Sequence, residues 1–140
     1  IMINNLINSY SDVMDNVNSL LKQNAAYLGI DINSIFETGG DIDGDNIPAP
    51  AIVFYLEPLD NKTPNAAGAI DFYLHFDILF SAEKSSTALR SCYEVMEKLN
   101  RIIPAAFDYK PKPNPITHKE TNSNIALTTL SFLGVLKVIK

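Results

Sequence analysis

The clearest pattern in the chain is an alternation of apolar and polar side chains over residues 69–82. Asp71, Tyr73, His75 and Asp77 lie between the apolar positions. A β-strand has a side-chain period of two, so the pattern predicts a long strand with one apolar and one mostly polar face. We expect the apolar face in the core and the polar face toward water or a partner. The apolar positions are Ile70, Phe72, Leu74, Phe76, Ile78 and Phe80.

Two further segments have the composition of strands, residues 51–58 and about residues 122–139. The first carries apolar and aromatic side chains at alternate and intervening positions, which predicts a central strand or a covered outer face. Residues 51–58 are expected to pair antiparallel with residues 69–82. Gly134, in the middle of the last segment, predicts a bulge or a bend.

Two segments have the three- and four-residue apolar spacing of amphipathic helices, residues 3–28 and about 86–103. Gly29 follows the last apolar position of the first segment and predicts the end of that helix. Ser85 or Ser86 is expected to cap the second helix.

The connecting segments are rich in turn-forming residues. Residues 104–115 contain four prolines and predict an extended arm, partly of polyproline type, that cannot form regular structure. Residues 37–50 and 59–68 predict loops. Residues 30–36 are compatible either with a helical turn capped by Asp31 or with an irregular strand.

The predicted order of elements is therefore α–β–β–α–β within a single domain, residues 1–140. The fold class expected from this order is α+β. We expect an antiparallel-dominated sheet of three to four strands, with the two main helices on one face.

Charge is distributed unevenly along the chain. The net charge is −5, but residues 1–80 sum to −9 and residues 81–140 to +4. An acidic chain is a poor candidate for nucleic-acid binding, because phosphate contacts dominate that affinity. A bipolar chain is suited to head-to-tail contacts between copies, although the two halves can also interleave in one fold and leave the asymmetry without spatial meaning.

Cysteine content and hydropathy restrict the setting. Cys92 is the single cysteine, so no disulfide forms within the chain, and its place on the apolar face of a helix predicts a buried thiol. The chain lacks an apolar run of about 20 residues, so we expect no membrane partner. The first ten residues do not have the pattern of a signal peptide, which favours a reducing cytoplasm or a particle assembled there.

An acidic loop with Asp41, Asp43 and Asp45 places carboxylates at alternating positions, as calcium sites do. The glycine comes one residue early for an EF-hand, and Ile52 stands where that motif needs a bidentate Glu. A solvated acidic loop or an acidic patch facing a partner explains the loop better than a metal site does.

Asp71, His75 and Asp77 share one strand face, which is the geometry for a metal site or acid–base chemistry. Asp71 and His75 alone lie about 13 Å apart, however, because a strand rises about 3.3 Å per residue. An ordinary solvent face or an interface explains the row better. The sequence contains no nucleophile elbow, phosphate-binding glycine loop or paired cysteines, so we expect no enzyme and no cofactor.

Three stretches together resemble the small tail-completion proteins of tailed bacteriophages, which include tail terminators and minor tail proteins. They are AIVFYLEP (51–58), AIDFYLHFDILFSAEKSSTALRSCYEVMEKLNRII (69–103) and NIALTTLSFLGVLKV (124–138). The resemblance implies a structural, non-catalytic subunit of a ring, usually sixfold, on the tail tube. It implies contacts with copies of itself, with the tube and with head–tail connector proteins. The corresponding location is the virion tail, assembled in the host cytoplasm.

The alternative function is a small binding module or enzyme that uses the polar face of residues 69–82, and a monomeric adaptor is a third option. If the chain forms a ring, its contacts should come from the charged loop, the polar strand face and the proline arm. The candidate interface residues are Asp41, Asp43, Asp45, Asp71, Tyr73, His75, Asp77, Lys110 and Lys112.

We predict that Lys110 and Lys112 of the arm face the acidic loop of a neighbouring subunit, the alternative being an arm that contacts only its own domain. Exposed ion pairs contribute about 0–1 kcal/mol each and are screened by salt. Assembly should therefore weaken with rising ionic strength and weaken further in the double variant Lys110→Glu/Lys112→Glu, as measured by mass photometry. An assembly indifferent to both changes would contradict this role.

Overall fold

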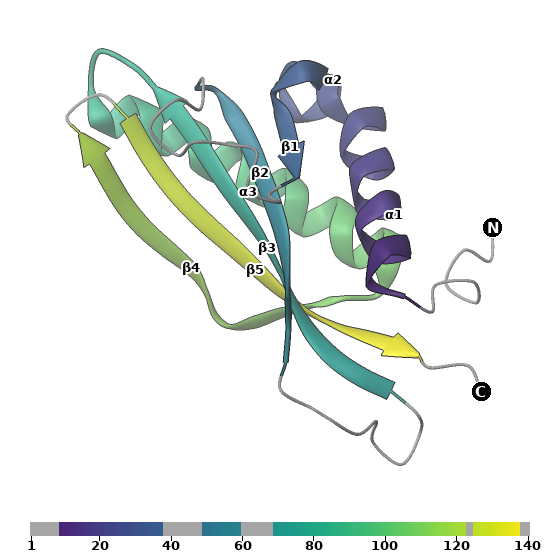
Figure 1. Ribbon diagram of the computed structural model, residues 1–140. Helices are drawn as coiled ribbons and strands as arrows, with labels where there is room; N and C mark the ends of the chain where they lie inside the picture. Colours follow the sequence, from purple (N-terminus) through teal and green to yellow (C-terminus); the bar gives the residue numbers. More distant parts are fainter. Residues whose placement is uncertain (1–8, 38–48, 60–68, 123–124, 138–140) are drawn as a thin grey trace.

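The computed structural model describes residues 9–37, 49–59, 69–122 and 125–137. In this part the chain is an α+β fold with a five-stranded mixed sheet of order β1-β2-β3-β5-β4. Figure 1 shows α3 running along the sheet and α1 lying beside β1. The elements are α1 (Tyr10–Gln23), α2 (Ala25–Leu28), the 3₁₀ turn η2 (Ile32–Ser34), β1 (Ile35–Glu37), β2 (Ala51–Pro58), β3 (Ala69–Ser81), α3 (Ser85–Phe107), β4 (Lys110–Asn122) and β5 (Ile125–Lys137).

The centre of the sheet is antiparallel, as expected, with β3 paired to β2 on one side and to β5 on the other. The expected count of three to four strands was too low, because β1 and β4 are added at the two edges. β1 is only three residues long and pairs with β2 in parallel, which makes the sheet mixed. The segment 30–36 contains both of the structures considered for it, since η2, capped by the Asp31 side chain, leads into β1.

The core lies between the helices and one face of the sheet. The in/out assignment of residues 69–82 is confirmed, because Phe72, Leu74, Phe76 and Ile78 are all fully buried. Directly opposite residues share a face, so the register places the even-numbered residues of β2, β3 and β5 on the helix side. Helix residues that complete this core include Val13, Val17, Leu21, Cys92, Leu99 and Ile103.

The first helical segment is interrupted at Asn24, although the sequence predicted one helix up to residue 28. The Asn24 side chain donates to the carbonyl of Leu20, and its backbone N–H also bonds to the end of α1. Such side-chain bonds to backbone compete with helix continuation. Gly29 ends α2 in the left-handed region with φ of 74°, which confirms the predicted stop.

The helix α3 is longer than predicted at both ends. It begins at Ser85 because the Lys84 carbonyl accepts from the N–H groups of Thr87 and Ala88, so neither predicted serine is the cap. It also continues through Pro104 to Phe107. Burial of Phe107 and stacking of its ring on Tyr109 at 5.3 Å favour one further turn, despite the missing proline donor.

The predicted irregular arm is wrong for most of its length, because residues from Lys110 onward form the edge strand β4. Its prolines at 111, 113 and 115 fall on alternate positions. Successive residues of a strand direct their N–H groups to opposite sides, so prolines two residues apart remove donors from one side only, as an edge strand permits. The β4–β5 register shifts between Pro111 and Ile116, where the proline run lies.

Gly134 does not mark a bulge, since the β3–β5 register is continuous through the Gly134–Phe72 pair. The glycine instead makes room for an aromatic ring. A Cβ at this position would lie 2.8 Å from the Cε1 and Cε2 atoms of Phe72 and closer still to Cζ. The Phe72 ring is held there by edge contacts with Tyr10 and Tyr109.

Gly134→Ala should therefore destabilise the fold by about 1–3 kcal/mol, the usual cost of overpacking a core. Denaturant unfolding measures this change, with Val135→Ala at the exposed neighbouring position as the control. The penalty should shrink in a Phe72→Leu background, where the ring is removed. Equal penalties in both backgrounds would show that the ring is not the cause.

Candidate functional site on the outer sheet face

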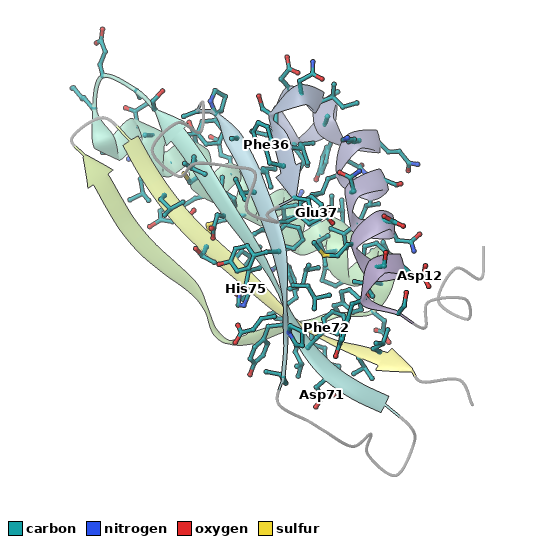
Figure 2. The ribbon with its side chains drawn as sticks, in the orientation of Figure 1. Asp12, Phe36, Glu37, Asp71, Phe72 and His75 are labelled. Carbon is teal, nitrogen blue, oxygen red and sulfur yellow. The ribbon has the colours of Figure 1, made fainter. Side chains whose placement is uncertain are left out.

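The sheet face opposite the helices, called here the outer face, carries the odd-numbered residues of β2, β3 and β5. The register places Tyr55, His75 and Ser131 in one row across these three strands. One neighbouring row consists of Val53, Asp77 and Thr129, and the other of Glu57, Tyr73 and Leu133. In Figure 2, His75 and Phe72 lie on opposite sides of β3.

His75 joins all three strands through its two ring nitrogens. Nδ1 lies 2.6 Å from Ser131 Oγ, and Nε2 lies 2.7 Å from Glu57 Oε1. An ionised carboxylate only accepts hydrogen bonds, so the neutral ring is assigned its proton on Nε2, which donates to Glu57. Nδ1 then accepts a hydrogen bond from the Ser131 hydroxyl. Protonation of Nδ1 would only require the Ser131 hydroxyl to rotate and accept, so the ring stays satisfied in both charge states.

The His75 ring is buried although no helix of the described chain covers this face. The residue is 7% exposed, and Ser131 is 5% exposed. The Tyr55 ring lies 4.9 Å from the His75 ring, centroid to centroid, and the Tyr73 ring lies 6.1 Å from it. Glu57 differs, because 56% of its side chain is exposed, so its bond to His75 is partly screened by water.

Asp77 belongs to a second set of hydrogen bonds, next to the set made by His75. Thr129 Oγ1 donates to Asp77 Oδ1 at 2.7 Å, and the Tyr55 hydroxyl donates to the same carboxyl group. Burial raises the pKa of Asp77 and outweighs the opposing effect of these bonds. Burial is also the main reason for the raised pKa of Tyr55, to which the nearby charges of Asp77 and Glu57 add.

The serine–histidine–glutamate line has the composition of a nucleophilic triad, but its surroundings do not suit catalysis. A nucleophile must reach the substrate, and the Ser131 hydroxyl lies in the middle of β5 on a nearly inaccessible residue. The line crosses three paired strands and leaves no ring nitrogen of His75 free. These hydrogen bonds link the three strands β2, β3 and β5 to one another.

The other candidate chemistries find little support in the described residues. Within residues 9–37, 49–59, 69–122 and 125–137, no three His, Cys, Asp or Glu side chains gather as a metal site requires. Cys92 is fully buried as predicted, with Sγ 3.5 Å from the carbonyl oxygen of Ile78, and burial raises the pKa of the thiol. None of the helices described combines the length and apolar character needed to cross a bilayer.

The sequence-predicted residues are only partly brought together. Asp71, Tyr73, His75 and Asp77 do share the outer face, but the bonding partners of His75 come from neighbouring strands, and the expected solvent exposure of His75 is wrong. Lys110 is exposed at the start of β4. The remaining predicted interface groups lie outside the described residues and side chains: Asp41, Asp43, Asp45 and the side chain of Lys112.

Sequence reasoning missed Glu57, Tyr55, Thr129 and Ser131 as members of this site. The alternation of side chains along each strand was an available signal, because each of these residues lies between core residues on a predicted strand. Alternation shows which face of the sheet a residue is on, but it does not show which residues of neighbouring strands lie opposite it. Only the observed pairing places Ser131 directly opposite His75 and Glu57 two residues along β2 from Tyr55, the other residue opposite His75.

Asp77→Asn should stabilise the protein at neutral pH, because it keeps an oxygen acceptor for Thr129 and removes a charge that burial disfavours. The pKa of folded Asp77 lies above its ordinary value of 3.8, so between these two values the folded state binds more protons than the unfolded chain. The free energy of unfolding therefore falls as pH rises through this window. The advantage of the variant should vanish as pH falls to 3.8.

Thermal and denaturant melts at several pH values measure the difference, and Asp71→Asn on the same strand face is the matched control. A neutral-pH loss of stability in Asp77→Asn would contradict the prediction. It would mean that the bonds to the ionised carboxylate outweigh the cost of its burial.

Comparison with known proteins adds no identification. Neither protein-family models nor curated proteins give a match to this chain. The functional argument therefore rests on the geometry and chemistry of the outer face and on the sequence pattern.

Proposed function

We propose that the chain is a structural subunit of a phage or prophage tail, a tail terminator or tail-completion ring that caps or joins the tail tube. The observation that carries this proposal is the one-sided cover of the sheet. The described helices pack against one face, and the opposite face of β2, β3 and β5 is left with side chains suited to contact with another protein.

The composition of the outer face supports an interface. Val135 is 46% exposed, and the partly exposed Leu133 and Tyr73 lie beside it. Glu57 and Asp71 add carboxylates around this apolar and aromatic centre. An apolar centre with a polar rim is typical of protein–protein interfaces.

The buried polar groups of the outer face support a structural rather than a catalytic role. Both ring nitrogens of His75 and the carboxyl group of Asp77 are hydrogen-bonded to side chains of neighbouring strands. A catalytic base needs a free acceptor within reach of a substrate proton. These groups instead fix the relative positions of three strands, as a rigid contact surface requires.

The pattern that resembles tail-completion proteins corresponds to the central elements of the fold. Its three stretches contain β2, β3 with α3, and β5, which together form the middle of the sheet and its main helix. On this proposal the partners are further copies of the chain, in a ring of sixfold symmetry as the resemblance implies, together with the tail tube and the connector. The proposed location is the virion tail, with no cofactor.

A second candidate is a binding module or hydrolase that uses the outer face, favoured by the Ser131–His75–Glu57 line of hydrogen bonds. It requires the Ser131 hydroxyl to be reachable. A fluorophosphonate probe tests it directly, and labelling that is lost in Ser131→Ala would replace the structural proposal by this one. The structural proposal predicts no labelling.

The ring is tested by mass photometry and negative-stain electron microscopy of the purified chain, alone and with tail-tube protein. Rings of defined subunit number are the expected result. Val135→Arg should weaken them, and Tyr93→Arg is the matched control, because Tyr93 is similarly exposed at 40% but lies on α3. A chain that remains monomeric under all conditions, tube protein included, would overturn the proposal.

A further inference from the structure

One row of the outer face has opposite charges at its two ends. Across the sheet, Glu57 of β2 lies opposite Tyr73 of β3, Tyr73 opposite Leu133 of β5, and Leu133 opposite Lys110 of β4. The row therefore runs from a carboxylate through an aromatic and an aliphatic side chain to an ammonium group. With strands about 4.8 Å apart, its two charged ends are separated by about 14 Å.

Both charged ends are available to a partner. Lys110 is exposed, and 56% of the Glu57 side chain is exposed. Glu57 uses Oε1 to accept from His75, which leaves Oε2 with lone pairs for a second donor. The His75 bond also holds the carboxylate in place, so less side-chain entropy is lost when a partner binds.

We propose that this row is a self-complementary docking surface on which a second copy of the chain packs face to face, related by a two-fold axis parallel to the strands. Such a rotation preserves the position along the strands and reverses the order of strands across the row. It places Glu57 of each copy against Lys110 of the other, and Tyr73 of each against Leu133 of the other. Each contact therefore occurs twice.

The geometry of packed sheets accommodates this pairing. Sheets that pack face to face lie about 10 Å apart, with strand directions within about 30° of each other. Lysine and glutamate side chains can span that gap at the edges, while the half-buried Tyr73 and Leu133 exclude water at the centre. The contact goes beyond the proposed ring, because a two-fold pair closes on itself and would join two rings or form a separate dimer.

Sedimentation equilibrium of the wild-type chain over a range of concentrations should show a dimer. Lys110→Glu sets two glutamates against each other in both halves of the interface and should raise the dissociation constant by at least about tenfold. Lys84→Glu is the matched control, because Lys84 is also exposed but is the N-cap residue of α3 and does not belong to the row. It should dimerise like the wild type.

A mixing experiment isolates the proposed pairing. Lys110→Glu and Glu57→Lys should each fail to pair with themselves, yet their equimolar mixture should form a heterodimer, since one ion pair is then the native one and the other is restored with reversed sign. Circular dichroism melts check that Glu57→Lys still folds without its His75 bond. If it does not, Glu57→Gln keeps an acceptor for His75 and should weaken dimerisation without unfolding the chain.

Three results would overturn the inference: a wild-type chain that stays monomeric, equal effects of Lys110→Glu and Lys84→Glu, or two folded variants that do not pair on mixing. The outcome is separable from the tail proposal. Rings that assemble alike in the wild type and in Lys110→Glu, with no two-fold pair in either, would contradict the two-fold contact and leave the tail proposal standing. A dimer that never forms a larger assembly with tube protein would contradict the tail proposal and leave the two-fold contact standing.

Discussion

The fold depends on the pairing of β3 with β5, which runs in one continuous register from the Ala69–Lys137 pair to the Ser81–Ile125 pair. Because side chains alternate between faces, this register decides at once which residues enter the core and which form the outer face. A slip by one residue would move Phe76 and its neighbours into water and bury the acids. Phe72, seated over Gly134, reinforces this pairing because its ring fits only where β5 has no side chain.

The same register creates the polar cluster on the outer face. It sets Ser131 opposite His75 and brings Glu57 within reach of the other ring nitrogen, so a buried imidazole is satisfied although none of the described helices lies above it. Unsatisfied buried polar groups cost more than hydrogen bonds return, which is why such a cluster is stable only when complete. On the proposed function, the surface of aromatic, aliphatic and charged groups around this cluster binds a partner protein.

Alternation alone was enough to predict β2, β3 and the two faces of the sheet, because that signal is local and period-two. It could not predict β4, since prolines usually indicate irregular structure and only an edge position with one-sided donors makes them compatible with a strand. It could not predict the last turn of α3 either, where packing of Phe107 overrides Pro104. The bonds of His75 depend on which residues lie side by side on different strands, and that lateral register is not contained in the pattern of any single segment.

The central claim is that the buried His75 imidazole on the outer face is hydrogen-bonded through both of its nitrogens to the two neighbouring strands. Nitrogen-15 chemical shifts of the His75 ring, measured by NMR on the neutral form of the imidazole, test it most directly. The account predicts a single tautomer with the proton on Nε2 and with Nδ1 accepting a hydrogen bond. A proton on Nδ1, or the averaged shifts of a freely solvated imidazole, would contradict it.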